Sequence, residues 1–192
     1  MEPNIDCTDN TDEELVKLTL ERQGYFAYLM DRYTKPLLRY IGRISNKSGD
    51  DAEDLLQDIF IKAYRNLNGF DDKLKFSSWL YRIAHNHVIS DFRKRKARLE
   101  DVSWSYDDEF LNNLKADFDL NDIVNTKFDQ EIVGKVLYKL DLKYREVLEL
   151  RFWEQMSYRE ISDVLKKPEG TIATLINRAK DNFRKEIKKY EK

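Results

Sequence analysis

The chain of 192 residues has few of the residues that build disulfides, metal sites and tight turns. It contains one cysteine, Cys7, and two histidines, so neither a disulfide framework nor a cysteine-based metal site can form within it. It has no run of about eighteen apolar residues, and it begins with the acidic stretch MEPNIDCTDNTDEE instead of a basic and then apolar leader. We therefore expect a folded cytoplasmic protein that needs no cofactor and does not insert into a membrane.

Glycine and proline are also scarce, with 6 and 3 in the chain, and no stretch alternates apolar and polar residues between turn signals. Apolar residues instead recur every three or four positions, which is the spacing of one helix face, and this predicts an all-α fold. A Thr11–Glu14 capping box predicts the first helix start, and Asp51 predicts another. Pro36 is expected in the first turn of a helix, because a helix interior tolerates proline poorly.

The periodicity and the charge both divide the chain into three parts. Residues 82–99 carry six basic residues against one acidic, residues 100–131 carry two against ten, and residues 132–192 carry fifteen against ten. Helical periodicity is weak in 100–131 and resumes at Ile132. We predict two small helical domains, 1–99 and 132–192, joined by an acidic linker, 100–131. Basic segments of this kind favour polyanionic partners, although a charge run is also typical of a solvated face.

The segment SYREISDVLKKPEGTIATLINRAKDNF, residues 157–183, reads as two short helices joined by a tight turn. Ser157 and Glu160 fit a capping box, and the KKPEG stretch breaks the first helix. The second helix would bury Ile172, either Leu175 or Ile176, Ala179 and Phe183, and would expose small polar residues with Asn177 and Arg178. That layout is typical of a DNA-binding helix-turn-helix, and the alternative is a helical hairpin that only packs.

A metal or hydrolase site at His85-Asn86-His87 is disfavoured by helix geometry. Residues two apart on a helix point about 200° from each other, so the two histidines cannot coordinate the same metal ion. The paired acids Asp50-Asp51 and Asp71-Asp72 are better explained as caps and turns than as acid–base machinery. We predict no catalytic and no metal-binding residues. The same helix carries a core stripe and an outward stripe that includes Arg82, Ile89 and Arg93.

Three segments in order resemble a sigma factor of the extracytoplasmic-function (ECF) type, in the sigma-70 superfamily. DAEDLLQDIFIKAYRNL (51–67) is similar to region 2.2, FSSWLYRIAHNHVISDFRKRK (76–96) to regions 2.3 and 2.4, and SYREISDVLKKPEGTIATLINRAKDNFR (157–184) to region 4.2. The resemblance implies a non-catalytic protein. It would bind core RNA polymerase, recognise the minus-35 and minus-10 promoter elements and promote DNA melting, with region 2 in residues 1–99 and region 4 in 132–192.

The resemblance also implies three sets of binding residues. The set for core polymerase is Asp54, Gln57, Asp58, Phe60 and Lys62. The set for melted minus-10 DNA is Phe70, Lys73, Lys75, Phe76, Trp79, Arg82, Asn86, Arg93, Lys94, Arg95 and Lys96. The set for the minus-35 element is Thr171, Ala173, Thr174, Asn177, Arg178 and Lys180. Trp79 is as compatible with the core as with DNA, and so are most apolar residues of 51–67.

The chain departs from the family pattern in its recognition helix. The family commonly has cations at the positions of Ala173 and Leu175, and their absence puts the promoter sequence in doubt but not the fold. The family implies an anti-sigma factor as a further partner, and an acidic linker that threads into the polymerase or acts as a tether. The rival interpretation is a stand-alone helix-turn-helix regulator that binds duplex DNA as a dimer with symmetric half-sites.

Overall fold

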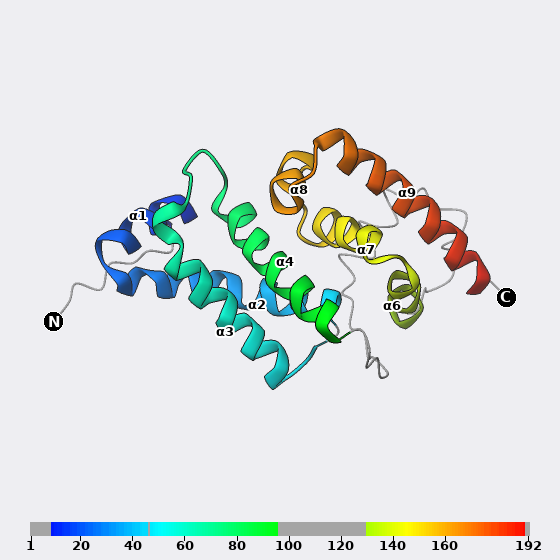
Figure 1. Ribbon diagram of the computed structural model, residues 1–192, viewed down its shortest axis with the longest axis horizontal. Coiled ribbons are helices and arrows are strands. Elements are labelled where there is room, and N and C mark those ends of the chain that lie inside the picture. The colour runs from blue at the N-terminus through cyan, green and yellow to red at the C-terminus, as the bar shows by residue number, and fades with distance from the viewer. Residues whose placement is uncertain (1–8, 46, 96–129, 191–192) are drawn as a thin grey trace. The chain divides into compact units, whose positions relative to one another are not determined.

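The computed structural model describes residues 9–45, 47–95 and 130–190, and all regular structure within these ranges is helical (Figure 1). The predicted all-α fold is confirmed for this part of the chain. The chain divides into two compact units, called here the N-terminal unit (Met1–Lys94) and the C-terminal unit (Arg95–Lys192). The predicted linker, 100–131, lies outside the described residues apart from the start of α6 at Gln130. None of the described helices has the length and apolarity that crossing a membrane requires.

The N-terminal unit begins with α1 (Asp12–Glu21) and α2 (Phe26–Ser45). The capping box is confirmed, because Thr11 Oγ1 accepts from the Glu14 N–H at 3.2 Å and the Glu14 carboxylate accepts from the Thr11 N–H at 2.8 Å. The prediction for Pro36 was wrong, since this residue lies inside α2. Proline in a helix costs about 3 kcal/mol. However, α2 buries Leu29 on one side of Pro36 and Leu37 and Ile41 on the other, and each is worth about 1.5–3 kcal/mol.

The unit continues with α3 (Asp50–Arg65) and α4 (Phe76–Arg95). The Asp51 cap was wrong, because Gly49 is the N-cap and its φ of 56° favours a residue without a side chain. The three- and four-residue spacing predicts one buried face on α3, made of Leu55, Leu56, Ile59, Phe60 and Ala63, and all five are buried. On α4, Ile89 was predicted on the outward stripe but is buried, and Ile83 was predicted in the core stripe but is only half-buried. The buried residues of the two helices include Leu55, Leu56, Ile59, Phe60, Ala63, Phe76, Leu80, Ala84 and Val88.

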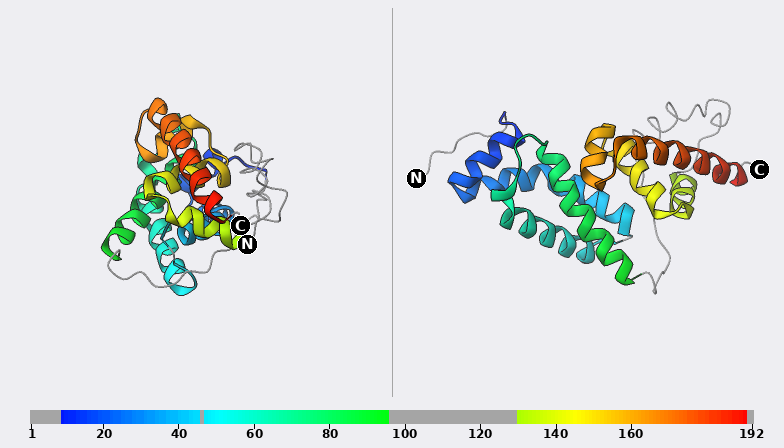
Figure 2. Two further views of the ribbon diagram at one scale, coloured as in Figure 1. Left: turned by 90° about the vertical axis from the view of Figure 1, so that its right-hand side faces the viewer. Right: turned by 45° about the horizontal axis from the view of Figure 1, so that its top comes forward.

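In residues 130–190, the described part of the C-terminal unit, the α-helices are α6 (Gln130–Lys139), α7 (Leu142–Leu148), α8 (Tyr158–Leu165) and α9 (Glu169–Ile187). A π-helical turn, Glu149–Trp153, continues α7. Helix α9 packs against α6, α7 and α8, and its course along them can be followed in Figure 2. One face of α9 forms the centre of this core, through Ile172, Ile176, Ala179, Phe183 and Ile187.

Candidate nucleic-acid interface

The helix-turn-helix is held by local hydrogen bonds at both ends of α8. At the start, Ser157 Oγ accepts from the Glu160 N–H at 3.3 Å, and the Glu160 carboxylate accepts from the Ser157 N–H at 2.7 Å. At the end, Lys166 adopts a left-handed conformation with φ of 52°, which turns the chain sharply. The Ser162 hydroxyl then donates to the Lys167 carbonyl at 2.6 Å. The Ser157 capping box predicted from the sequence is therefore confirmed, and α9 starts only four residues after α8 ends.

The outward face of α9 carries four exposed residues of the predicted minus-35 set: Thr171, Thr174, Asn177 and Arg178. Their spacing of three and four places them on one stripe, opposite the buried stripe. The choice left open between Leu175 and Ile176 is resolved, since Ile176 is fully buried and Leu175 is half-buried. The Thr174 hydroxyl donates to the Gly170 carbonyl at 2.9 Å, which leaves its oxygen lone pairs and its methyl group for a partner.

Two predicted minus-35 residues lie at the edges of this stripe. Ala173 is half-buried, and so is Lys180, whose Nζ lies 5.6 Å from the centroid of the Phe152 ring. A cation over a ring face is attracted by the ring quadrupole. Lys180 therefore lies over the Phe152 ring, and of the two cations in the predicted minus-35 set Arg178 is the exposed one.

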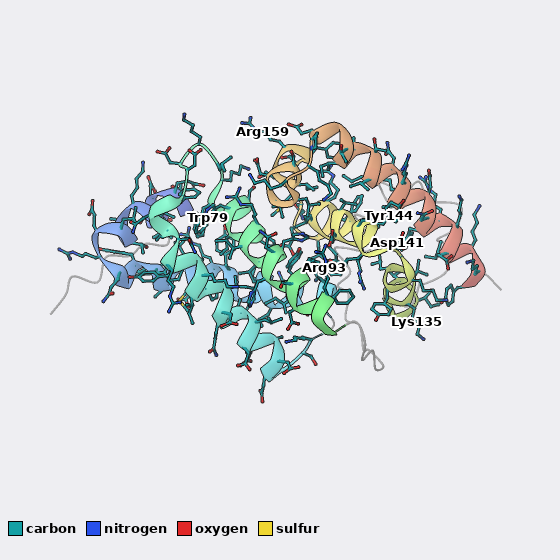
Figure 3. All side chains as sticks on the ribbon, in the orientation of Figure 1. Trp79, Arg93, Lys135, Asp141, Tyr144 and Arg159 are labelled. Carbon is teal, nitrogen blue, oxygen red and sulfur yellow. The ribbon has the colours of Figure 1, made fainter. Side chains whose placement is uncertain are left out.

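In the N-terminal unit, the loop 70–75 lies against an aromatic cluster. The Phe70 ring lies 5.7 Å from Phe76 and 5.6 Å from Trp79, both edge-on, and the Tyr33 ring lies 5.7 Å from Phe76. Phe76 and Trp79 are buried, whereas Phe70 is half-buried. Figure 3 shows Trp79 on the first turns of α4. Of the three predicted aromatics, Phe70 is the one with surface to offer a base.

The tip of this loop is shaped by Asp71. Its side-chain Oδ1 accepts from the Lys73 N–H at 3.1 Å, and its carbonyl accepts from the Leu74 N–H at 3.0 Å. This is an Asx turn, in which an aspartate side chain replaces a backbone turn. Lys73 and Lys75 are exposed on either side of Leu74. The loop therefore presents two cations next to the half-buried Phe70.

The two histidines of α4 contact different helices, as their spacing predicts. His85 Nδ1 lies 3.1 Å from the Tyr40 hydroxyl of α2. His87 contacts the Lys62 ammonium of α3 through Nδ1, and its Nε2 lies 3.3 Å from an Asp58 carboxylate oxygen. Burial and the charge of Lys62 lower the pKa of His87. Within the described ranges, no group of three or more histidine, cysteine, aspartate or glutamate side chains could hold a metal ion.

A groove of about 590 Å³ runs between α3 and α4. Asp58 and Lys62, predicted to contact polymerase, line it together with Asn86, predicted to contact DNA. The two predicted surfaces therefore meet along this groove. Asn86 is exposed at its rim, and the side chains that complete the lining are Leu55, Asn66, Ile83, His87, Ser90 and Asp91.

The outer face of α3 carries the remaining residues predicted to bind polymerase. Asp54 and Gln57 are exposed, like Asp58 and Lys62, but Phe60 is only 5% exposed and packs edge-on against Phe26. Sequence reasoning missed Ile61 and Tyr64, which are 48% and 42% exposed. A signal was present for Ile61, because it falls outside the buried three- and four-residue spacing of α3. This face thus combines acids with exposed apolar surface.

The basic end of α4 is described only in part. Arg93 is exposed near the end of the helix, as Figure 3 shows, and Arg82 is half-buried. The side chains of Lys94 and Arg95, and Lys96 as a whole, lie outside the described residues. The structure thus brings the loop, Asn86 and Arg93 onto one unit and the α9 stripe onto the other.

These features define a class of protein: a two-unit helical protein with a helix-turn-helix in one unit and an aromatic, cation-flanked loop in the other. The family model for sigma-70 region 2 matches residues 29–98, and the model for sigma-70 region 4 matches residues 130–182. The ECF RNA polymerase sigma factor SigW of Bacillus subtilis is 34% identical over 171 residues, covering 86% of this chain and 90% of SigW. The RNA polymerase sigma-H factor of Pseudomonas aeruginosa is 31% identical over 188 residues, covering 94% and 95%. The chain belongs to the sigma-70 family, within its ECF group.

Solved structures share the fold. CnrH, in its complex with the cytosolic domain of CnrY, is 25% identical with a TM-score of 0.64, over 90% of this chain and 94% of CnrH. The sigma factor RpoE of Bartonella quintana, in complex with the anti-sigma factor NepR, is 23% identical with a TM-score of 0.66, over 85% and 96%. The helical architecture is therefore common to this chain, CnrH and the Bartonella RpoE.

Proposed function

We propose that this protein is an RNA polymerase sigma factor of ECF type, which binds core polymerase, recognises minus-35 and minus-10 promoter elements and promotes melting. The observation that carries the proposal is the pairing of a region 2 unit with a region 4 unit, each with its own exposed polar surface. The domains would be residues 1–99 and 132–192, with 100–131 as the linker. The protein itself would perform no chemistry, and it would work in the cytoplasm beside the polymerase.

Core polymerase would bind the outer face of α3. Asp54, Gln57, Asp58 and Lys62 supply exposed polar and charged groups, and Ile61 supplies apolar surface at the same face. Charged rims steer association, whereas apolar contacts supply burial, and transient interfaces combine the two. Phe60 would not contact polymerase directly. Its packing against Phe26 would instead hold α3, which carries this face, in position.

Melted minus-10 DNA would bind the loop and the outer surface of α4. An unstacked base needs an aromatic wall, hydrogen-bonding groups and nearby cations. Phe70 offers the wall, with Phe76 and Trp79 behind it, and Asn86 offers an amide. The cations proposed to meet the phosphates are Lys73, Lys75, Arg82, Arg93, Lys94, Arg95 and Lys96.

The minus-35 element would bind the outward stripe of α9 in the major groove. Asn177 and Arg178 carry the donors and acceptors that distinguish base edges, and Thr171 and Thr174 keep the helix surface small enough to approach them. Ala173 would contact a thymine methyl group. Lys180 would leave Phe152 to reach a phosphate, at the cost of its contact with the ring.

An anti-sigma factor is the further partner that we propose. CnrH and the Bartonella RpoE were solved with CnrY and NepR bound. A regulator of this kind would act by covering the surfaces that polymerase needs, including the outer face of α3.

Association with core polymerase tests the proposal and separates it from a stand-alone dimeric regulator. We expect the purified protein to be a monomer that forms a one-to-one complex with core polymerase in size-exclusion chromatography. Replacing Gln57 and Ile61 by Ala should weaken that complex, while Asn177→Ala should not. A stable dimer that binds a symmetric duplex site tightly without polymerase would contradict the proposal.

A further inference from the structure

Two adjacent carboxylates in the first turn of α1 contact two different helices. Asp12 accepts from the Arg32 guanidinium of α2 at 2.8 Å and from the Tyr33 hydroxyl. Glu13 points to α4 instead, where its Oε1 accepts from the backbone N–H of Phe76 at 2.9 Å. These partners are 63 residues apart in the chain, and Phe76 is the first residue of α4. Helix α1 is thereby tied to the start of α4.

The start of α4 lacks an acidic residue of its own. The first turn of any helix has N–H groups without helical partners, and a nearby carboxylate satisfies them and complements the helix dipole. The first turn of α4 contains no aspartate or glutamate, and the preceding residue is Lys75, which has no acceptor on its side chain. Glu13 therefore does for α4 what an N-cap residue ordinarily does, but from another helix.

The hydrogen bond of Glu13 lies at one end of the loop 70–75. The other end is held by the Phe70 ring against Phe76 and Trp79, and the tip is closed by the Asp71 turn. Phe76 is thus shared by both anchors, through its ring and through its N–H. Any movement of the Phe76 backbone shifts Lys75 directly, and it also changes the surface against which the Phe70 ring packs.

We propose that Glu13 is a positioning residue for minus-10 recognition: by capping α4 it fixes the loop 70–75 in the shape that receives the melted strand. The inference rests on the proposed function, because the loop is the surface proposed there for the minus-10 base. Glu13 touches no DNA in this proposal. It acts through the Phe76 N–H, and its loss would cost binding by letting the loop sample other shapes.

The test compares three variants in holoenzyme formed with core polymerase. The probe is a fluorescent nontemplate-strand oligonucleotide that carries the minus-10 element of a promoter transcribed by the wild-type holoenzyme. Glu13→Ala should weaken binding by roughly five- to tenfold, the population shift that corresponds to the loss of one cap. Glu13→Gln keeps a carbonyl acceptor without the charge, so it should restore part of the affinity.

Glu21→Ala is the matched control. Glu21 is exposed at the other end of α1, so its replacement removes the same charge from the same helix without removing the capping box or the contact with α4. The affinity of this variant for the oligonucleotide should stay near the wild-type value. Equal losses for Glu13→Ala and Glu21→Ala, or equal loss of polymerase association, would overturn the proposal.

Hydrogen exchange on the free protein gives a second readout that needs neither polymerase nor a promoter. Amides of 73–78 should exchange faster in Glu13→Ala and in Glu13→Gln than in the wild type, while those of α9 should not change. If Glu13→Ala does not fold, Glu13→Gln alone decides. Unchanged exchange at Phe76 would refute the positioning role, and a wild-type holoenzyme that fails to initiate would refute the proposed function instead.

Discussion

Substitution of Asn177 and Arg178 by Ala should abolish recognition of the minus-35 element while leaving the fold intact. Both side chains are exposed on α9, and neither makes a hydrogen bond or an ion pair with another described residue. Exposed substitutions of this kind change the free energy of unfolding by about 0.5 kcal/mol or less. Alanine is also the better helix former at both positions. The thermal unfolding curve should therefore be nearly unchanged.

The loss in promoter binding is expected to be much larger. A side chain that reads a base edge contributes about 1–3 kcal/mol of discrimination. Two such losses give about 2 kcal/mol at the least, and since about 1.4 kcal/mol is a factor of ten, initiation at limiting holoenzyme should fall by about thirtyfold or more. The assay is abortive initiation on a promoter with an intact and with a scrambled minus-35 element.

A control variant on the same helix separates base reading from general charge loss. Lys185→Ala removes one cation two turns beyond Arg178, about 10 Å along the axis. It should reduce initiation only slightly and keep the preference for the intact element. A double variant that still discriminated between the two templates, or that lost polymerase association to the same extent as initiation, would contradict base reading by Asn177 and Arg178.

Three further predictions concern the core, the histidine and the basic end of α4. Ile176→Ala should lower the free energy of unfolding of the C-terminal unit by about 2–5 kcal/mol in urea denaturation, because Ile176 is fully buried. Leu175→Ala should lower the free energy of unfolding less, because Leu175 is only half-buried. Equal losses for the two variants would contradict the assignment of Ile176 to the buried face. Because the folded-state pKa of His87 is lowered from 6.5, the unfolded chain binds more protons, so stability is full above pH 6.5 and declines as the pH falls below it. His87→Gln should flatten that decline, and an unchanged pH profile would argue against a lowered pKa of His87, whose main cause is burial. Arg93→Ala should reduce the slope of log binding constant against log salt by roughly 0.7 for the single-stranded minus-10 oligonucleotide, and an unchanged slope would remove Arg93 from the phosphate contacts.

The periodicity of apolar residues predicted the helices well, because the buried residues of a helix recur every three or four positions. In α9, Ile172, Ala179 and Phe183 are buried as their spacing indicates. The choice between Leu175 and Ile176 stayed open because three- and four-residue steps are both compatible with one face. It was decided by α9 packing on three other helices, which is tertiary information.

Helix ends were predictable only where the signal is local. The capping boxes at Thr11 and Ser157 are closed by residues three positions away, so the sequence contains both partners. Gly49 was missed because it is followed directly by two aspartates, Asp50 and Asp51, and aspartate is preferred over glycine at an N-cap. Pro36 was missed because the burial on both sides of it outweighs one lost hydrogen bond.

The contacts that organise the candidate site span large sequence separations and leave no local trace. Glu13 and Phe76 are 63 residues apart, and Lys62 and His87 are 25 apart. The resemblance could suggest that the loop 70–75 binds DNA, but the sequence could not show that Glu13 of α1 caps α4, the helix that follows this loop. It also could not separate the half-buried Phe70 from the buried Phe76 and Trp79, since all three are aromatic residues near one turn.

The central claim, that this protein confers promoter recognition on RNA polymerase, is tested most directly by in vitro transcription from a promoter library. Core polymerase alone, the protein alone and the mixture are compared, and the RNA 5′ ends are mapped by sequencing. Discrete start sites are expected only in the mixture, downstream of shared minus-35 and minus-10 elements. The same start sites with core polymerase alone, or no discrete start site in the mixture, would contradict it.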